Sequence, residues 1–183
     1  MQGIIEGAIW FLVGDYYVTF AAIGLVIGLI VAGVRHRWRQ PGRSGWRTLL
    51  DHHVLWAVGV ANAVNFVFHS FLGDQSAALI GWAQSPFQLE VALASLGMAV
   101  AGFIAFPRRS GWIAKLVAVI SPAIFLFGAG AGHIWQQLAN GDQAFANSGP
   151  ILYSDLYLPI VSAFLLVMAR LEARRAERPI RPS

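Results

Sequence analysis

The sequence predicts an all-α integral membrane protein, a bundle of five transmembrane helices that forms a single domain over residues 1–183. Composition is the first observation: 57% of the residues are hydrophobic and only 12% are charged, whereas soluble domains carry about 25% charged residues. The second is that the apolar residues gather in five runs, each near the ~20 residues needed to cross a bilayer. A surface so poor in charge requires lipid as its solvent.

The first predicted span follows an unusually long apolar stretch. Residues 3–14 are expected to form a short interfacial helix, or an extension of a tilted first span at about residues 17–34. Tyr16 and Tyr17 between them are typical of the aromatic belt at a membrane interface. Gly24 and Gly28, four residues apart in the span, favour close packing against a neighbouring helix.

The other four spans are separated by polar connections, the first of them rich in arginine. They are expected at about residues 48–72, 87–106, 112–138 and 153–169. Pro86 precedes the third span, where its missing N–H is tolerated because the first turn leaves that group unpaired. The glycines Gly128, Gly130 and Gly132 in the fourth span favour close helix packing over a cofactor cradle.

The basic residues predict the orientation of the bundle. All thirteen Lys and Arg residues lie in or beside the connections after spans one and three and in the C-terminal tail. Five spans place these three segments on one side, and the positive-inside rule makes that side cytoplasmic. The N-terminus is therefore expected outside the cytoplasm and the C-terminus inside it, whereas four or six spans would divide the basic segments between the two sides.

Several classes of function are excluded or disfavoured. The chain has no cysteine, so disulfides, thiolate metal sites and cysteine nucleophiles are excluded. Its basic residues form short blocks beside apolar runs, without an aromatic-interleaved stripe, which favours contact with lipid headgroups over nucleic acid. Residues 1–11 contain no Lys or Arg and are interrupted by Glu6, so this segment is interpreted as retained and not as a secretory signal.

Polar residues within the predicted spans require an explanation, because placing an ionisable group in lipid is unfavourable in free energy. The second span carries Asp51, Asn62, Asn65 and His69, which in an α-helix would lie within about 40° of one line along its axis. This line is either a seam that hydrogen-bonds neighbouring helices or a route for protons or ions. The adjacent pair His52 and His53 is expected to anchor the cytoplasmic interface.

Four ionisable residues from four spans are expected to converge near the outer side. They are His69, Glu90, His133 and Asp155. Small residues on its own helix face predict that Glu90 points into the bundle. Two imidazoles and two carboxylates form a ligand set for Zn or Fe; the alternatives are a hydrogen-bonded polar core or a proton-active site. His69 and His133 alone could instead ligate a haem.

Short motifs in spans three to five resemble those of an uncharacterised family of small bacterial membrane proteins. The motifs are Ser85-Pro86-Phe87-Gln88-Leu89-Glu90-Val91, Gly132-His133, Asn147-Ser148-Gly149, and Asp155 with Pro159. The resemblance implies that Glu90, His133 and Asp155 belong to the pattern of the family, and it implies a bacterial inner membrane. His69 lies outside the matched stretch, and no established activity accompanies the family.

The leading hypothesis is thus a multi-pass inner-membrane protein with an outer-side site of His, Glu and Asp residues that binds a metal. Whether it catalyses a reaction is left open by the sequence. The first alternative is a non-catalytic accessory subunit of a larger membrane complex, because the many Trp and Phe residues provide apolar surface for helix and lipid contacts. The second is a proton-coupled carrier that uses the polar line of the second span.

Overall fold

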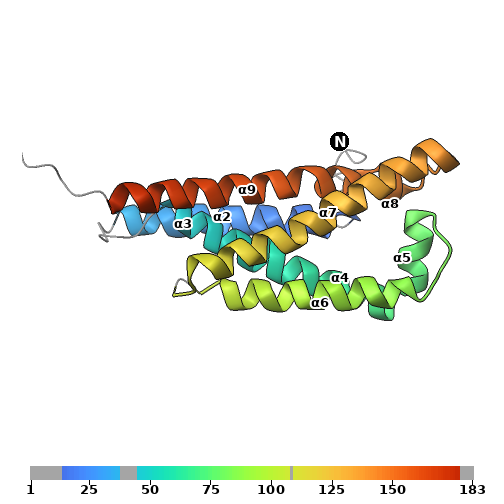
Figure 1. Cartoon of the computed structure of the whole chain (residues 1–183), viewed down its shortest axis with the longest axis horizontal. Helices are drawn as coiled ribbons and strands as arrows, with labels where there is room; N and C mark the ends of the chain where they lie inside the picture. The colour runs from blue at the N-terminus through green and yellow to red at the C-terminus, as the bar shows by residue number, and fades with distance from the viewer. Residues whose placement is uncertain (1–13, 38–44, 108, 178–183) are drawn as a thin grey trace, which may run out of the picture.

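Long helices that run side by side make up the computed structural model of this chain, which describes residues 14–37, 45–107 and 109–177 (Figure 1). No strand occurs in these described segments. The helices are α2 (Tyr16–Arg37), α3 (Gly45–His53), η1 (Val54–Val60), α4 (Ala61–Phe71), α5 (Gly73–Ile80), α6 (Phe87–Ala105), α7 (Trp112–Asn140), α8 (Phe145–Ser148) and α9 (Pro150–Ala176). The predicted all-α class is confirmed for this part of the chain.

Five of the helical stretches are long and apolar enough to cross a membrane. They are Tyr16–His36, Gly45–Phe71, Phe87–Ala105, Trp112–Asn140 and Phe145–Ala176. Each corresponds to one predicted span, so the predicted number of spans is confirmed. The fifth begins earlier than predicted, because α8 leads directly into α9 and Pro150 occupies the first turn of α9, a position that suits proline. The interfacial helix expected at residues 3–14 falls outside the described residues except for Gly14.

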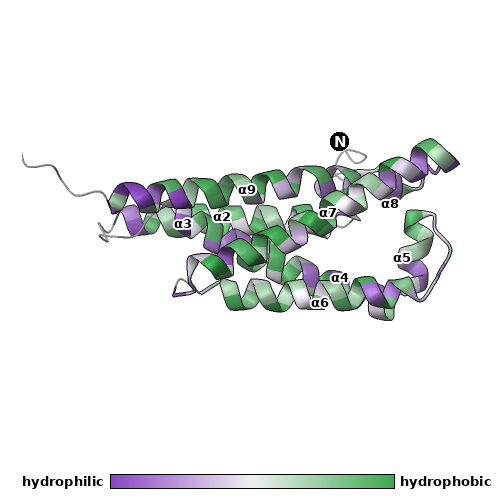
Figure 2. Cartoon of the chain, viewed as in Figure 1, coloured by the Kyte–Doolittle hydropathy of each residue, from purple (hydrophilic) through white to green (hydrophobic). Residues whose placement is uncertain are grey.

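The hydropathy of the bundle changes along its long axis. Hydrophobic residues cover its middle, and hydrophilic residues gather at the end of α9 and α3 and at the opposite end near α5 and α8 (Figure 2). Many large apolar side chains in the middle are exposed, including Ile30, Ile104 and Ile124. Such a belt fits a hydrocarbon layer bounded by two polar interfaces.

The second span contains a π-helical segment, which sequence periodicity did not reveal. Helix α3 continues without a break into η1 and then into α4. A π-helix closes its hydrogen bonds over i→i+5 and therefore has more residues per turn than an α-helix. Asp51 before η1 and Asn62 after it consequently do not keep the α-helical register that placed them on one line. The predicted alignment of these residues on one line is wrong for this reason, whereas the polar contacts that they were expected to make with neighbouring helices are present.

Glycines allow the second span to approach its neighbours closely. A Cβ on Gly102 of α6 would lie 2.6 Å from the backbone nitrogen of Gly59 in η1. A Cβ on Gly24 of α2 would lie 2.8 Å from the carbonyl oxygen of His52, and one on Gly28 would lie 3.3 Å from Cα of Leu49. The predicted packing role of Gly24 and Gly28 is confirmed, and these contacts hold the continuous helix of α3 and η1 between α2 and α6.

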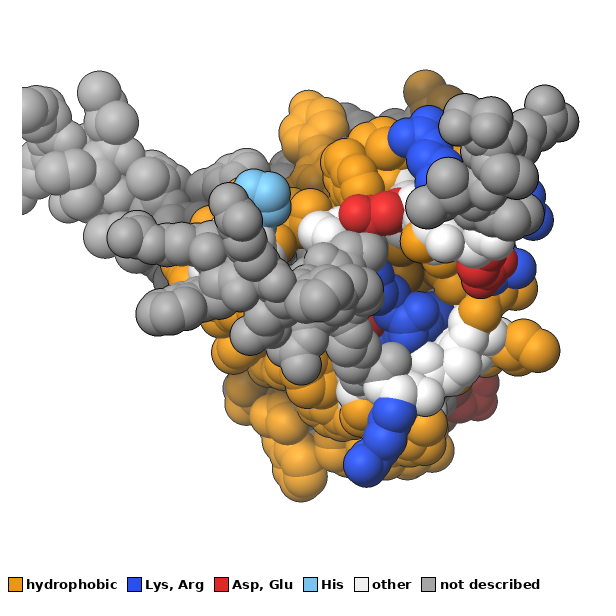
Figure 3. Space-filling view, turned by 90° about the vertical axis from the view of Figure 1, so that its left-hand side faces the viewer, with side chains coloured by type: hydrophobic (Ala, Val, Ile, Leu, Met, Phe, Trp, Pro, Cys, Tyr) orange, Lys and Arg blue, Asp and Glu red, His pale blue; other side chains and the backbone are white. Residues whose placement is uncertain are grey.

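Ion pairs connect α3 and α7 at the end of the bundle where both helices begin. Nζ of Lys115 lies 2.5 Å from Oδ1 of Asp51 and 3.1 Å from the carbonyl oxygen of Phe106. Nε of Arg47 lies 3.0 Å from the same carboxylate. Seen from this end, Lys and Arg side chains occupy a hollow among the helix ends (Figure 3). Lys115 is fully buried, so the carboxylate of Asp51 is its required partner.

Candidate functional site

A histidine and an aspartate on neighbouring helices form the centre of a buried polar site at the opposite end of the bundle. His133 on α7 and Asp155 on α9 are 5% and 3% exposed. Nε2 of His133 lies 3.6 Å from Oδ2 of Asp155. Gly130, one turn before His133, lets α9 approach, because a Cβ there would lie 3.3 Å from Cβ of Asp155. Burial and close helix packing therefore hold the two groups within ion-pair distance.

The short helix α8 determines which nitrogen of His133 carries a proton. Oδ1 of the buried Asn147 lies 2.7 Å from Nδ1 of His133. The amide of Asn147 has a defined orientation, because its Nδ2 donates to the carbonyl oxygen of Asp142 at 2.9 Å. A carbonyl oxygen can only accept, so Nδ1 of His133 must be the donor. In the neutral imidazole Nε2 is then an unprotonated acceptor, and it faces Asp155.

A proton is required between His133 and Asp155. Oδ2 of Asp155 is buried and has no hydrogen-bond partner among the residues that the structure describes. An ionised carboxylate opposite an unprotonated imidazole nitrogen would place two acceptors face to face, away from water, which is costly. One proton on either group converts the contact into an ion pair or a donor–acceptor pair. The geometry therefore forms a site for one proton.

Asp15 adds a second buried carboxylate to the site. It precedes α2, where its Oδ1 accepts a hydrogen bond of 3.1 Å from the backbone N–H of Val18, as an N-cap residue does. Its Oδ2 is buried without a hydrogen-bond partner in the described part of the chain. Burial raises the pKa of Asp15 above its ordinary value of 3.8. Asp15 also lies close enough to Asp155 for their charges to interact, so the two carboxylates oppose ionisation of each other.

Tyrosines and amides extend the polar site toward α4 and α6. The hydroxyl of Tyr17 donates to Oδ1 of Asn62 at 3.0 Å, and the hydroxyl of Tyr16 donates to Oδ1 of Asn65. Nδ2 of Asn65 in turn donates to Oγ of Ser95 at 2.6 Å. Tyr17 is buried, so its expected place in an interfacial aromatic belt is wrong. Both amides of α4 thus accept hydrogen bonds from tyrosines of α2, and Asn65 also connects α2 to α6 through Ser95.

The aromatic ring of Trp82 lies beside His133 and is partly exposed at the surface. The rings of Trp82 and His133 have centroids 5.5 Å apart, and an aromatic face of this kind stabilises a cation beside it. Trp82 also lines an open depression of about 460 Å³ with the polar side chains of Gln136, Asn140 and Asp142. The polar site thus approaches water at this end of the bundle, through Trp82 and through the hydrogen bonds of Asn147 to Asp142.

Comparison with known proteins assigns a family. A model for a family of unknown function, DUF6790, matches residues 14–175. This chain belongs to the DUF6790 family. No curated protein and no solved structure matches it. The family assignment brings no activity, and the chemistry of this DUF6790 protein must be argued from its own residues.

Of the four residues predicted to converge, the structure brings His133 and Asp155 together. His69 lies on α4, where its Nδ1 contacts Oε1 of Gln88. Glu90 is exposed on α6, so the prediction that it points into the bundle is wrong. Its face of small residues does not pack inward, since a Cβ on Gly97 would meet no atom within 4 Å.

The predicted four-residue metal site is not assembled in this DUF6790 chain. Among the described residues, no three His, Asp or Glu side chains are grouped so that they could hold a metal ion. His69 and His133 have different surroundings, one beside Gln88 and the other between Asn147 and Asp155. Binding of Zn, Fe or a haem by these residues stays a prediction, which elemental analysis and an absorption spectrum of the purified protein would test.

Three residues of the site and its surroundings were not identified from the sequence. Asp15 interrupts the first apolar run, and that interruption was its only signal. Asn147 was noted only as part of a motif that resembles those of an uncharacterised family, and the motif alone gave it no role. His53 was expected at the interface; it is instead fully buried, with Nε2 2.7 Å from Oγ of Ser162. The prediction that it anchors the interface is wrong, because η1 and α9 enclose it.

Proposed function

We propose that this chain is a proton-binding membrane protein, in which His133 and Asp155 bind and release one proton near the outer side of the bilayer. One observation carries the proposal: the unprotonated Nε2 of His133 faces a buried carboxylate oxygen of Asp155 that has no other hydrogen-bond partner among the described residues. Ionisable groups buried inside membrane proteins frequently mark proton relays. The membrane location itself follows from the five apolar helices.

The orientation that we propose follows from charge. The N-terminus lies outside the cytoplasm and the C-terminus lies in the cytoplasm of a bacterial inner membrane, because the Lys and Arg residues that the structure describes lie toward the end of the bundle where α3 and α7 begin (Figure 3). The positive-inside rule supports this orientation. It places His133 and Asp155 toward the outer side and the Lys115–Asp51 pair toward the cytoplasm.

The hydrogen bonds around the pair connect it to an open depression at the proposed outer side. Asn147 connects His133 to the carbonyl of Asp142, a residue that lines the open depression. Asp15 is placed to sense the charge of Asp155. A change of charge on the pair would therefore act on the first turn of α2 as well as on α7 and α9.

Infrared difference spectroscopy during a pH titration tests the proposal. The wild-type protein in lipid should show the carbonyl stretch of a protonated carboxylic acid that titrates, and Asp155→Asn should lose the part of this band that Asp155 contributes, because an amide does not titrate. Asp74→Asn is the matched control, since Asp74 is an exposed carboxylate on α5 at the same end of the bundle. An unchanged band in folded Asp155→Asn would overturn the proposal.

A further inference from the structure

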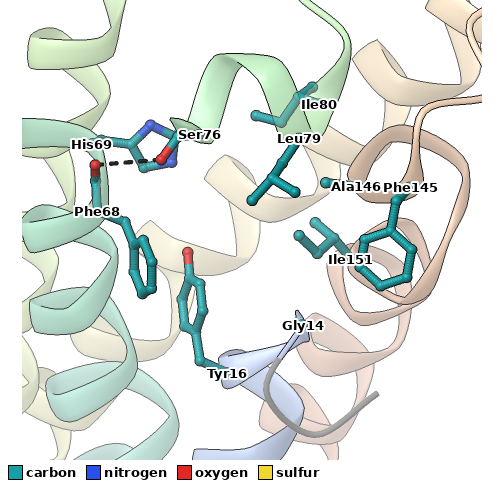
Figure 4. A pocket seen from close by; sticks show the side chains of 10 residues that line it. All are labelled: Gly14, Tyr16, Phe68, His69, Ser76, Leu79, Ile80, Phe145, Ala146 and Ile151. Atoms are coloured by element: carbon teal, nitrogen blue, oxygen red, sulfur yellow. Dashed lines mark hydrogen bonds between the residues drawn. The ribbon is translucent and has the colours of Figure 1, made fainter. Parts of the chain in front are cut away.

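A second cavity lies beside the proton site and is almost entirely apolar. Its volume is about 460 Å³, within the range of small-molecule sites. Tyr16 and Phe68 lie on one side below His69, and Leu79, Ile151 and Phe145 lie across from them (Figure 4). The lining comes from α2, α4, α5, α8 and α9, so the cavity is a built part of the outer half of the bundle.

The polar side chains that line this cavity all use their protons elsewhere. The hydroxyl of Tyr16 donates to Asn65, and the hydroxyl of Ser76 donates to the carbonyl oxygen of Phe68 at 3.3 Å (Figure 4). Nδ1 of His69 is paired with Oε1 of Gln88, and because a carbonyl oxygen only accepts, Nδ1 is the donor and Nε2 the acceptor. The side chains of the cavity wall therefore offer hydrogen-bond acceptors but no free donor.

The orientation of the Tyr16 proton is fixed by a chain of hydrogen bonds. Nδ2 of Asn65 donates to Oγ of Ser95 at 2.6 Å, and Oγ of Ser95 donates to the carbonyl oxygen of Val91 at 2.8 Å. The amide of Asn65 must then present its oxygen to Tyr16. The hydroxyl of Tyr16 cannot turn its proton into the cavity without leaving Asn65 Oδ1 unpaired and buried, which is costly.

We propose that the cavity binds a lipid-derived molecule that carries a hydroxyl group. The apolar walls take the hydrocarbon body of the ligand, and the hydroxyl donates its proton to Nε2 of His69. A purely hydrocarbon ligand would leave this acceptor unpaired, and a carbonyl or carboxylate head would meet only acceptors. The cavity lies at the outer ends of α4 and α9, the level where hydroxyl-bearing headgroups meet the acyl layer.

Binding of 4-octylphenol to the full-length protein in lipid nanodiscs tests the proposal. Tritiated 4-octylphenol should bind saturably above the background of empty nanodiscs, and unlabelled 4-octylphenol should displace it. The methyl ether, 4-octylanisole, has the same apolar body without a donor and should compete about tenfold less well, the effect of one lost hydrogen bond. Equal competition by the ether would overturn recognition of the hydroxyl group, and absence of saturable binding would overturn the cavity as a site.

Variants separate this ligand site from protein stability and from the proton site. His69→Phe keeps a ring and removes the acceptor, so the preference for the phenol over the ether should disappear. His36→Phe, at an exposed histidine of the opposite end, should retain this preference.

Leu79→Trp at a half-exposed wall position should reduce binding of both compounds by filling the cavity. Asp155→Asn should bind 4-octylphenol as the wild type does, so the two proposals can fail independently. Retained preference in His69→Phe would contradict the assignment of His69.

Discussion

At the scale of single residues, the buried ionisable side chains at the two ends of the bundle differ in their partners. Lys115 is fully buried, and the carboxylate of Asp51 lies 2.5 Å from it, so the end where α3 and α7 begin has a complete ion pair. At the opposite end, one oxygen of Asp15 and one of Asp155 are buried without a hydrogen bond in the described part of the chain. The first arrangement stabilises the fold, whereas a buried carboxylate such as Asp155, whose contact with His133 needs a shared proton, is typical of a functional site.

The ion pair of Lys115 and Asp51 leads to a prediction about stability. Asp51→Asn should lower the free energy of unfolding by about 3–5 kcal/mol, because it leaves the charge of Lys115 buried without its counter-ion. The double variant Asp51→Leu with Lys115→Met should recover much of the loss, since it removes both charges. Unfolding in detergent micelles measures these changes, with Asp74→Asn as a control expected near the wild type. A wild-type value for Asp51→Asn would show that the pair does not stabilise the fold.

At the scale of elements, η1 is the feature that the sequence could not reveal. A helical period of 3.6 residues predicted one line of polar residues along the second span, but the π-helical turn changes which neighbour each side chain faces. Asp51 therefore contacts α7, and Asn62 contacts α2. The existence of five apolar helices was predictable, because length and hydropathy depend on composition. The partner of each polar group was not, because it depends on helix rotation.

The close contact between η1 and α6 is also testable. Gly102→Ala should destabilise the protein by about 1–3 kcal/mol, because its new Cβ would overlap the backbone of Gly59 and force α6 away from η1. Gly97→Ala on the same helix is the matched control: a Cβ there meets no atom within 4 Å, and alanine favours the helix by about 1 kcal/mol. Thermal unfolding of both variants in detergent distinguishes them, and equal melting temperatures would rule out the close contact.

At the scale of the whole molecule, sequence and structure agree on a bundle with polar ends and an apolar belt. The distribution of basic residues predicts its orientation, which the arrangement of helices alone does not determine. The polar site around His133 was predictable in part: His133 and Asp155 come together as their shared depth indicated. Glu90 does not join them, because small residues on one face of α6 indicated a buried face that the bundle does not form.

Reporter fusions test the proposed orientation. A cytoplasm-active reporter should be active after residue 183 and in the connections after α2 and α6, and a periplasm-active reporter should be active in the connection between α7 and α8. The physical reason is the retention of Arg and Lys on the cytoplasmic side. A C-terminal fusion that is active only on the periplasmic side would contradict the orientation and would reverse the sides assigned to the two polar sites.

Nitrogen NMR of His133 in lipid bilayers tests the central claim most directly. Protein labelled with ¹⁵N-histidine is compared with His133→Gln to assign the signals, since the shift of each ring nitrogen reports whether it carries a proton. The hydrogen bond to Asn147 predicts that Nδ1 stays protonated as pH is varied, while the Nε2 signal titrates and changes in Asp155→Asn. A proton on Nε2 with Nδ1 unprotonated, or an Nε2 signal that is indifferent to Asp155→Asn, would contradict the proton site.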